Sequence, residues 1–244
     1  FNAEYIATGH YAAVNHSRFR KRYILKKAKD KKKDQSYFLF RLKQAVLKKI
    51  IFPLSDLSKD EVRSLAKNLR LKTHNRPDSQ EVCFISGGGY KDFLIKEDPS
   101  LARPGPVIFS KTKEVLGQHM GIAFYTIGQR RGLAVAYKEP LYVTAIDKTG
   151  NAIIVGTEKE TCSSGLLAER VNWVSAEKID KPVKVMAQIR YNQQPARAMI
   201  GSLGKDKAKV EFAQPQKDVA PGQAVVFYKE EVVLGGGIIS KVIK

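Results

Sequence analysis

Short β-forming runs separated by turn residues fill the chain from about residue 105 to its end, and signals for helices nearly vanish there. The segment LYVTAIDKTGNAIIVG, residues 141–156, predicts a hairpin because two β-rich arms flank turn residues. In KPVKVMAQIRY, residues 181–191, apolar and polar residues alternate as in a half-buried strand. KAKVEF and GQAVVFYKEEVVLGGGII predict three further strands. Closure removes exposed strand edges, so we expect a small C-terminal β-barrel of the six-stranded type.

The first 98 residues have a different pattern, which is typical of an α/β domain. In SKDEVRSLAKNLRL, Ser58 and Glu61 have the spacing of a capping box, in which each side chain bonds a free backbone N–H of the first helical turn. A helix is therefore predicted to follow Ser58. The apolar residues that recur at helical spacing, and that we expect to form one buried face, are Val62, Leu65, Ala66 and Leu69.

Three prolines within DPSLARPGPVIF, residues 98–109, mark a boundary between these two patterns. We therefore predict three domains. They are an α/β domain over residues 1–98, a central mostly-β domain over residues 99–168 and the β-barrel over residues 169–244. The chain starts directly in a strand pattern without an initiator Met, which favours a fragment that lacks an N-terminal piece.

The charge of the chain points to a polyanionic partner. Lys and Arg number 43 against 24 Asp and Glu, a formal net charge of +19. An excess of this size attracts nucleic acid or acidic membrane, although a lysine-rich surface that only keeps the protein soluble is the alternative. No apolar run approaches the roughly 20 residues that span a bilayer, and no basic amphipathic helix stands out, so nucleic acid is favoured over membrane. Two distant cysteines favour a reducing, cytosolic compartment over a disulfide framework.

Cys83 lies in SQEVCFISGGGY, where an apolar run stops at three glycines. A cysteine between apolar residues is often a small buried hydrophobe. A thiol at a strand end beside a glycine loop and a helix start is also well placed to react, because a helix N-terminus and nearby cations lower its pKa. The residues alone leave both interpretations open.

Five short motifs in one order resemble the tRNA-specific 2-thiouridylase family. They are ATGHYA at residues 7–12, KDQSYFL at 33–39, VCFI at 82–85 followed by DFL at 92–94, GQHMGIAFYTIGQRRGL at 117–133, and LGGGII at 234–239. The resemblance covers the whole chain and corresponds to the C-terminal two-thirds of the family. It implies that residues 1–98 are the remnant of an adenine-nucleotide alpha-hydrolase-like domain with a PP-loop. A phosphate-binding loop of the Ser-Gly-Gly-x-Asp-Ser type does not occur in the sequence.

The resemblance also implies a reaction. ATP, with Mg²⁺ expected from the family, adenylates the C2 oxygen of the wobble uridine, and a cysteine persulfide then supplies sulfur to C2 to give 2-thiouridine. Cys83 matches the persulfide carrier, and Gly9 matches a glycine that contacts ATP, whose main phosphate site would lie outside this chain. Cys162 does not match the second cysteine of the family. The chain alone is therefore expected to accept sulfur without turning over.

The resemblance assigns tRNA contacts to two segments, and the sequence offers no cluster of metal ligands. Lys33, Asp34 and Gln35 match one segment that contacts tRNA, and Arg190 and Tyr191 match another. Cations can neutralise phosphates, polar groups can bond a splayed-out nucleotide, and a tyrosine ring can stack on an unpaired base. The expected partners are the anticodon arm of tRNA and a sulfur-relay protein or cysteine desulfurase.

Two other functions stay open at this point: a non-catalytic basic RNA-binding module, and a cysteine-based redox enzyme that binds no nucleic acid. Arg130 and Arg131, which lie between glycines, could contact phosphate or form an inter-domain hinge.

Overall fold

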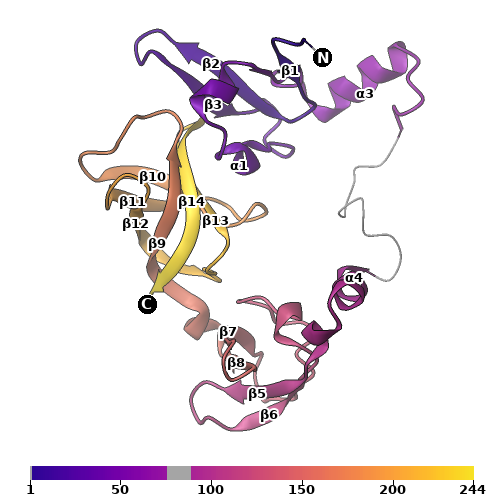
Figure 1. Cartoon of the computed structure of the whole chain (residues 1–244), viewed down its shortest axis with the longest axis vertical. Helices are drawn as coiled ribbons and strands as arrows, with labels where there is room; N and C mark the ends of the chain where they lie inside the picture. Colours follow the sequence, from indigo (N-terminus) through magenta and orange to yellow (C-terminus); the bar gives the residue numbers. More distant parts are fainter. Residues whose placement is uncertain (1, 76–88) are drawn as a thin grey trace. The chain divides into compact units, whose positions relative to one another are not determined.

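The computed structural model describes residues 2–75 and 89–244. The chain divides into two compact units (Figure 1). The first consists of residues 1–76, 164–215 and 221–243, and the second of residues 77–163, 216–220 and 244. Each unit is described by itself below.

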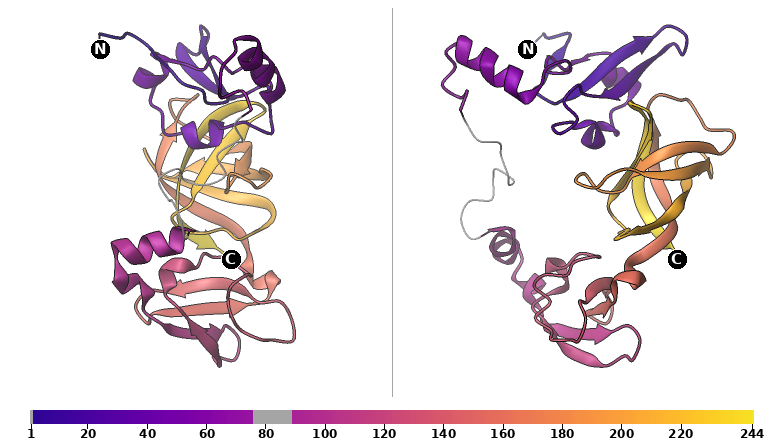
Figure 2. Two further views of the ribbon diagram at one scale, coloured as in Figure 1. Left: turned by 90° about the vertical axis from the view of Figure 1, so that its right-hand side faces the viewer. Right: turned by 180° about the vertical axis from the view of Figure 1, so that it is seen from behind.

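A closed six-stranded β-barrel is the centre of the first unit (Figure 2). Its strands pair in the order β13-β10-β11-β12-β9-β14, and pairing of β13 with β14 closes the sheet. The predicted barrel is therefore confirmed, and β9 runs across residue 168, where the central domain was predicted to end. The strands are β9 (Cys162–Trp173), β10 (Val183–Gln188), β11 (Ala196–Ser202), β12 (Ala208–Lys217), β13 (Ala224–Lys229) and β14 (Val232–Ile243).

The N-terminal segment adds a hairpin to this barrel. Strands β2 and β3 form an antiparallel pair, and β3 continues the barrel sheet by pairing with β14 through Lys26 and Val232. Strands β1 and β4 form a separate two-stranded parallel sheet. The elements are β1 (Ile6–Ala7), β2 (Ala12–Ser17), β3 (Arg22–Lys27), α1 (Ser36–Leu39), α2 (Gln44–Leu47), β4 (Ile50–Ile51) and α3 (Lys59–Asn68).

One hydrophobic core joins the N-terminal segment to the barrel. Leu25, Phe40 and Leu47 pack in the same buried cluster as Val226 and Tyr228. Burial of this apolar surface holds the hairpin and the two short helices against β13 and β14. Hydrogen bonds add to it, because the Asn172 side chain donates to two backbone carbonyls that follow α1, and the Gln44 side chain donates to carbonyls of Tyr23 and Val174.

The glycines of LGGGII are required by close packing. A Cβ at Gly236 would lie 2.7 Å from the Val225 carbonyl oxygen and 2.7 Å from the Phe40 ring. A Cβ at Gly235 would lie 2.5 Å from the Asn172 oxygen. Neighbouring backbone occupies the space that a side chain would need, so this motif has a structural explanation in β14.

Helix α3 confirms one expectation and contradicts another. The capping box forms, with the Ser58 backbone N–H donating to Glu61 and the Glu61 backbone N–H donating to the Ser58 hydroxyl. The predicted buried face is wrong for the described part of the chain, where no residue of α3 is buried and Leu65 and Leu69 are 47% and 69% exposed.

The second unit contains a four-stranded sheet in the order β6-β5-β8-β7. The predicted hairpin of residues 141–156 is confirmed as β7 and β8, and Asp147 accepts backbone hydrogen bonds that shape its turn. None of the helices in the described residues is long and apolar enough to cross a membrane. The elements are α4 (Gly89–Glu97), η1 (Pro99–Ala102), β5 (Gly105–Phe109), β6 (Val115–His119), η2 (Ile122–Phe124), β7 (Tyr142–Asp147), β8 (Ala152–Gly156) and η3 (Glu158–Thr161).

Candidate nucleic-acid interface

Only one of the two cysteines lies among the residues that the structure describes. Cys83 lies outside the described residues, so its predicted role stays a prediction. Cys162 begins β9, where its half-buried thiol faces the Glu158 carbonyl at 3.9 Å. Among the residues described, no group of His, Cys, Asp and Glu could hold a metal ion.

The two segments predicted to contact tRNA meet at one groove of the first unit. Asp34 and Tyr191, which are far apart in the sequence, both line it, and its volume is about 540 Å³. We call it the basic groove. Its lining residues are Lys27, Lys31, Lys32, Asp34, Tyr37, Gln188, Tyr191, Asn192, Gln193, Gln194, Pro195 and Glu231.

Asp34 holds the loop that forms one wall of the basic groove. Its carboxylate accepts hydrogen bonds from the Ala28 backbone N–H at 2.9 Å and from the Ser36 hydroxyl at 2.7 Å. The Ser36 hydroxyl lies 3.2 Å from the hydroxyl of Tyr228, a fully buried residue of the shared core. Burial raises the pKa of the Asp34 carboxyl above its ordinary value, and these hydrogen bonds oppose the rise only in part.

Gln35 is tied to the segment that follows β1. Its side-chain oxygen accepts a hydrogen bond from the Tyr11 backbone N–H at 3.0 Å, and the Gln35 backbone N–H donates to the Tyr11 carbonyl at 2.8 Å. The structure therefore gives Asp34 and Gln35 internal bonds that fix the loop. Lys33, between Asp30 and Asp34, is half-exposed beside the groove without lining it.

Aromatic rings form the other wall of the groove. The Tyr191 ring lies 4.5 Å from the Phe38 ring and 6.1 Å from the Tyr37 ring, measured between centroids. Phe38 is 54% exposed although it follows a buried residue of α1. Burial raises the pKa of Tyr37 to about 12, so its hydroxyl stays protonated at neutral pH and donates to the Ala224 carbonyl.

The turn that carries Arg190 and Tyr191 is held by Gln188. The Gln188 side-chain amide donates to the carbonyl oxygens of Arg190 at 3.1 Å and Tyr191 at 2.8 Å. The reasoning from sequence did not single out Gln188, Tyr37 or Phe38. The available signal for the two aromatic residues was their position directly after KDQS in the motif KDQSYFL, residues 33–39.

The cations of the groove are partly engaged. Lys31 forms an ion pair with Glu231, and the Lys27 amine lies 4.3 Å from the centroid of the Tyr228 ring. Three lysines against two carboxylates leave the lining net positive. A positive lining beside exposed aromatic rings is the combination that binds a single-stranded nucleic acid.

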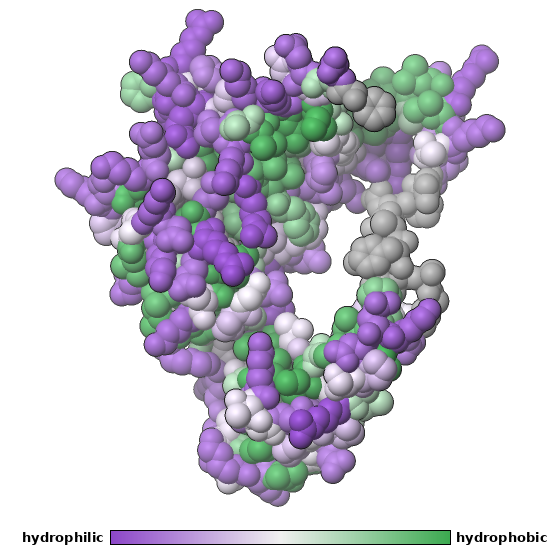
Figure 3. Space-filling view, in the orientation of Figure 1, coloured by the Kyte–Doolittle hydropathy of each residue, from purple (hydrophilic) through white to green (hydrophobic). Residues whose placement is uncertain are grey.

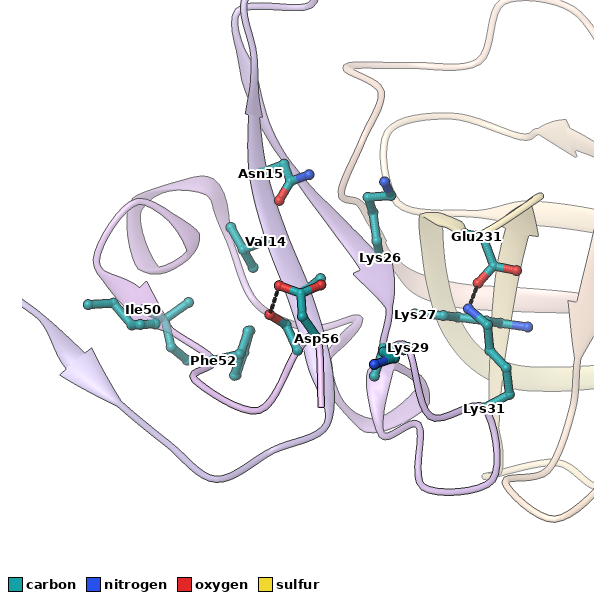
Figure 4. Close-up of a pocket in the computed structure, with 14 residues that line it drawn as sticks. Val14, Asn15, Lys26, Lys27, Lys29, Lys31, Ile50, Phe52, Asp56 and Glu231 are labelled. Carbon is teal, nitrogen blue, oxygen red and sulfur yellow. Dashed lines mark hydrogen bonds and ion pairs between the residues drawn. The ribbon is translucent and has the colours of Figure 1, made fainter. Parts of the chain in front are cut away.

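A second groove, with a volume of about 630 Å³, shares Lys27, Lys31 and Glu231 with the first. Figure 4 shows the side chains that line it, with Lys26 and Lys29 on the β3 side and Ile50 and Phe52 from β4 and its end. Lysines therefore line both grooves along β3 and the loop that follows it.

Gly9 lies after β1, beside the segment that follows β4. A Cβ placed on Gly9 would meet only Leu54 at 3.9 Å, an ordinary contact, and the backbone is outside the left-handed region. The fold therefore does not require glycine at this position. Parallel strands carry ligand sites at their carboxyl ends, and β1 and β4 are parallel, so approach of a ligand to the Gly9 backbone stays a consistent explanation.

Replacing Asp34 separates a structural role from an RNA contact. We expect Asp34→Asn to bind tRNA like the parent chain, because an amide oxygen can still accept from Ala28. We expect Asp34→Ala to lower the free energy of unfolding by roughly 1–3 kcal/mol, because it leaves buried donors unsatisfied. Denaturant unfolding and tRNA titration measure the two effects.

The pH dependence of stability gives a further check on Asp34. The pKa of Asp34 is raised in the folded state above its ordinary value of 3.8. The contribution of Asp34 to the free energy of unfolding is therefore most favourable below pH 3.8, and it declines as the pH rises through the pKa of the folded state. The difference in unfolding free energy between the parent chain and Asp34→Asn should follow this trend. A difference that grows in favour of the parent as pH rises would contradict the assignment.

Three family models match successive parts of the chain. A tRNA methyl transferase HUP domain matches residues 1–87, a tRNA methyl transferase PRC-barrel domain matches residues 91–157, and an aminomethyltransferase beta-barrel domain matches residues 163–239. The matches thus define a class of protein in which a HUP domain, a PRC-barrel domain and the closed β-barrel seen here follow one another along the chain.

Similar full-length proteins narrow this class. The chain is 46% identical over 240 residues to the tRNA-specific 2-thiouridylase MnmA of Halothermothrix orenii. This alignment covers 98% of the chain and 66% of that protein. It is 43% identical to the protein of that name from Natranaerobius thermophilus, over 98% of the chain and 64% of that protein. It is 42% identical to the one from Acetivibrio thermocellus, over 97% of the chain and 66% of that protein.

The chain belongs to the tRNA-specific 2-thiouridylase family. It spans just under two thirds of the length of these relatives. The matches run over nearly the whole chain, and they do not bear out the expectation of a C-terminal fragment without the N-terminal phosphate loop.

Proposed function

We propose that the chain acts in 2-thiolation of tRNA, and that the basic groove binds an unpaired part of the anticodon arm. The observation that carries the proposal is the meeting of the two predicted tRNA segments at one net-positive, aromatic-lined groove. Two models that match the chain carry the words methyl transferase, whereas the similar full-length proteins are named for thiolation. The full-length matches are the more specific, so we favour thiolation.

In this proposal the groove divides into binding and positioning parts. Tyr191, which lines the groove, and Phe38, whose ring packs on it, offer ring faces for stacking on a splayed-out base. Lys32, which lines the groove, and Arg190, which precedes Tyr191 in the chain, neutralise phosphates. Asp34, Gln35 and Gln188 position the two loops through their internal hydrogen bonds.

The chemistry in this proposal is sulfur transfer. ATP, with Mg²⁺, would adenylate the C2 oxygen of the wobble uridine, and Gly9 would let the backbone approach the nucleotide. The terminal sulfur of a persulfide on Cys83 would then bond to C2 while AMP leaves with the former C2 oxygen. A second thiol, which Cys162 does not match, would attack the Cys83 sulfur and break the S–S bond, so that the outer sulfur stays on C2 as the thiocarbonyl and Cys83 ends in a disulfide. A sulfur-relay protein or cysteine desulfurase would load Cys83 by thiol exchange. A tRNA substrate makes the cytosol the expected compartment.

The groove predicts how tRNA binding responds to substitution and salt. With a transcript that carries a wobble uridine, we expect Tyr191→Ala to weaken binding about tenfold and Tyr191→Phe to leave it unchanged, because stacking needs only the ring. Lys32→Gln should weaken binding and reduce the slope of log K against log salt by about 1. Fluorescence anisotropy over a salt series measures both quantities.

Lys209→Gln on β12 is the matched control for loss of one lysine outside the groove, since Lys209 pairs with Glu211. Salt-independent binding, or no binding, would argue against an RNA function and favour a redox protein. Normal RNA binding with no capacity to accept sulfur would favour the non-catalytic RNA-binding module.

A further inference from the structure

The tip of the β2–β3 hairpin presents an exposed aromatic ring among cations. Phe19 is 96% exposed, which is the largest exposed fraction among the exposed large hydrophobic residues of the described chain. Its neighbours in SRFRKR, residues 17–22, are Arg18, Arg20, Lys21 and Arg22. A ring that contributes nothing to the core, at the end of a hairpin, has no structural role in the described fold.

The turn that carries Phe19 is ordered by its own hydrogen bonds. The Lys21 backbone N–H donates to the Arg18 carbonyl at 3.3 Å, and the Arg20 backbone N–H donates to the Ser17 hydroxyl at 3.2 Å. Lys21 has a φ of 48°, in the left-handed region that closes such a turn. The backbone around Phe19 is therefore ordered, so little backbone conformational entropy is lost when the exposed ring makes a contact.

The base of the hairpin tip is fixed to the end of β9 and the residues after it. The Arg20 guanidinium donates to the Ser175 carbonyl at 3.0 Å, and the Arg22 guanidinium donates to the Trp173 carbonyl at 3.4 Å. These two arginines also line a groove of about 580 Å³ with Lys178, Lys181 and Lys229. Its acidic members are Glu177 and Asp180, so cations exceed carboxylates by five to two.

We propose that this hairpin tip, residues 18–21, is a second tRNA contact in which Phe19 stacks on an unpaired base and Arg18 and Lys21 neutralise the flanking phosphates. The proposal rests on the proposed function, because it assigns further RNA contacts to the same protein. Arg20 and Arg22, which hold the tip on the barrel, extend the positive surface along the adjacent groove.

The chemistry of the hairpin tip favours RNA over a protein partner. The aromatic side chain stands alone, and the residues on both sides are cationic, whereas a protein-docking site needs a contiguous apolar patch. Figure 3 shows hydrophilic side chains crowded over the end of the β2–β3 hairpin, which is labelled in Figure 1. One exposed ring among cations matches the stacking-plus-phosphate pattern of single-stranded RNA recognition.

Three substitutions at Phe19 test the stacking directly. In anisotropy titrations with a tRNA transcript, we expect Phe19→Ala to weaken binding about tenfold without a change in salt slope. Phe19→Leu should lose as much, because an aliphatic side chain does not stack, and Phe19→Trp should bind at least as well as the parent. Binding of tRNA should quench the fluorescence of the new indole. The only other tryptophan of the sequence, Trp173, is buried and contributes a constant background signal.

Matched measurements separate the possible outcomes. Arg18→Gln and Lys21→Gln should each reduce the salt slope by about 1. Unchanged affinity of Phe19→Ala, while Tyr191→Ala is weakened, would overturn the hairpin contact and leave the proposed function intact. Parent-like binding by Phe19→Leu, or an equal loss on a blunt RNA duplex, would overturn base stacking. Absence of tRNA binding by the parent chain would overturn both proposals.

Discussion

Replacing Cys83 by serine is expected to abolish sulfur loading of the chain. A persulfide forms on a thiolate, and a serine hydroxyl neither ionises at neutral pH nor exchanges with a donor persulfide. The measurement is retention of label after incubation with a cysteine desulfurase, a sulfur-relay protein and ³⁵S-cysteine. The label on the parent chain should be released by a reducing agent, as a persulfide requires.

The chain supplies its own control, because Cys162 is the only other cysteine. Cys162→Ser should keep the full label, since that thiol begins β9 and faces the Glu158 carbonyl. Label that persists in Cys83→Ser and disappears in Cys162→Ser would reverse the assignment. Label in both variants would indicate sulfur held elsewhere, and the carrier role of Cys83 would then be wrong.

Gly236→Ala is expected to destabilise the first unit by roughly 2–3 kcal/mol, because overpacking at a site bounded by backbone cannot relax through side chains alone. The new Cβ would meet the Val225 carbonyl oxygen and the Phe40 ring, each at 2.7 Å. β14 would have to move away from both β13 and the segment after α1. Denaturant unfolding followed by circular dichroism measures the loss of unfolding free energy.

Gly201→Ala is the matched control, since Gly201 also lies in a barrel strand but nothing occupies the space within 4 Å of its added Cβ. We expect it to leave stability unchanged or to raise it by about 0.4–1 kcal/mol, through a less flexible unfolded chain. Equal destabilisation of the two variants would mean that glycine in these strands matters for a reason other than close packing.

The barrel was predictable because its strands carry local signals. The alternation in residues 183–190 and the turns between later strands are properties of neighbouring residues, and the structure reproduces them. The pairing of the N-terminal hairpin with β14 was not predictable in this way. It depends on the pairing of Lys26 with Val232, and no local sequence pattern specifies which distant strand will pair with the edge strand β3.

Helix α3 shows the limit of periodicity as a guide to burial. The spacing of its apolar residues correctly predicts a helix, and the capping box correctly predicts its start. Whether that apolar face is covered depends on other parts of a structure, and in the described residues Leu65 and Leu69 stay exposed. Periodicity identifies the face without identifying its partner.

The candidate site followed from resemblance more than from physical pattern. The motifs placed Asp34 and Tyr191 in the same function, and the fold brings both to one groove. The supporting roles of Gln188 and Phe38 were missed, because a side chain that bonds a turn backbone or packs on a distant ring leaves no periodic trace in the sequence.

The attachment of the hairpin to the last barrel strand has a consequence for synthesis on the ribosome. Lys31 and its ion-pair partner Glu231 are 200 residues apart, on the two segments that β3 and β14 bring together. At about 5–20 residues per second, the nascent hairpin waits roughly 10–40 s for its docking strand. During that delay the apolar side of β3 is open to aggregation, which makes this segment a natural client for a chaperone.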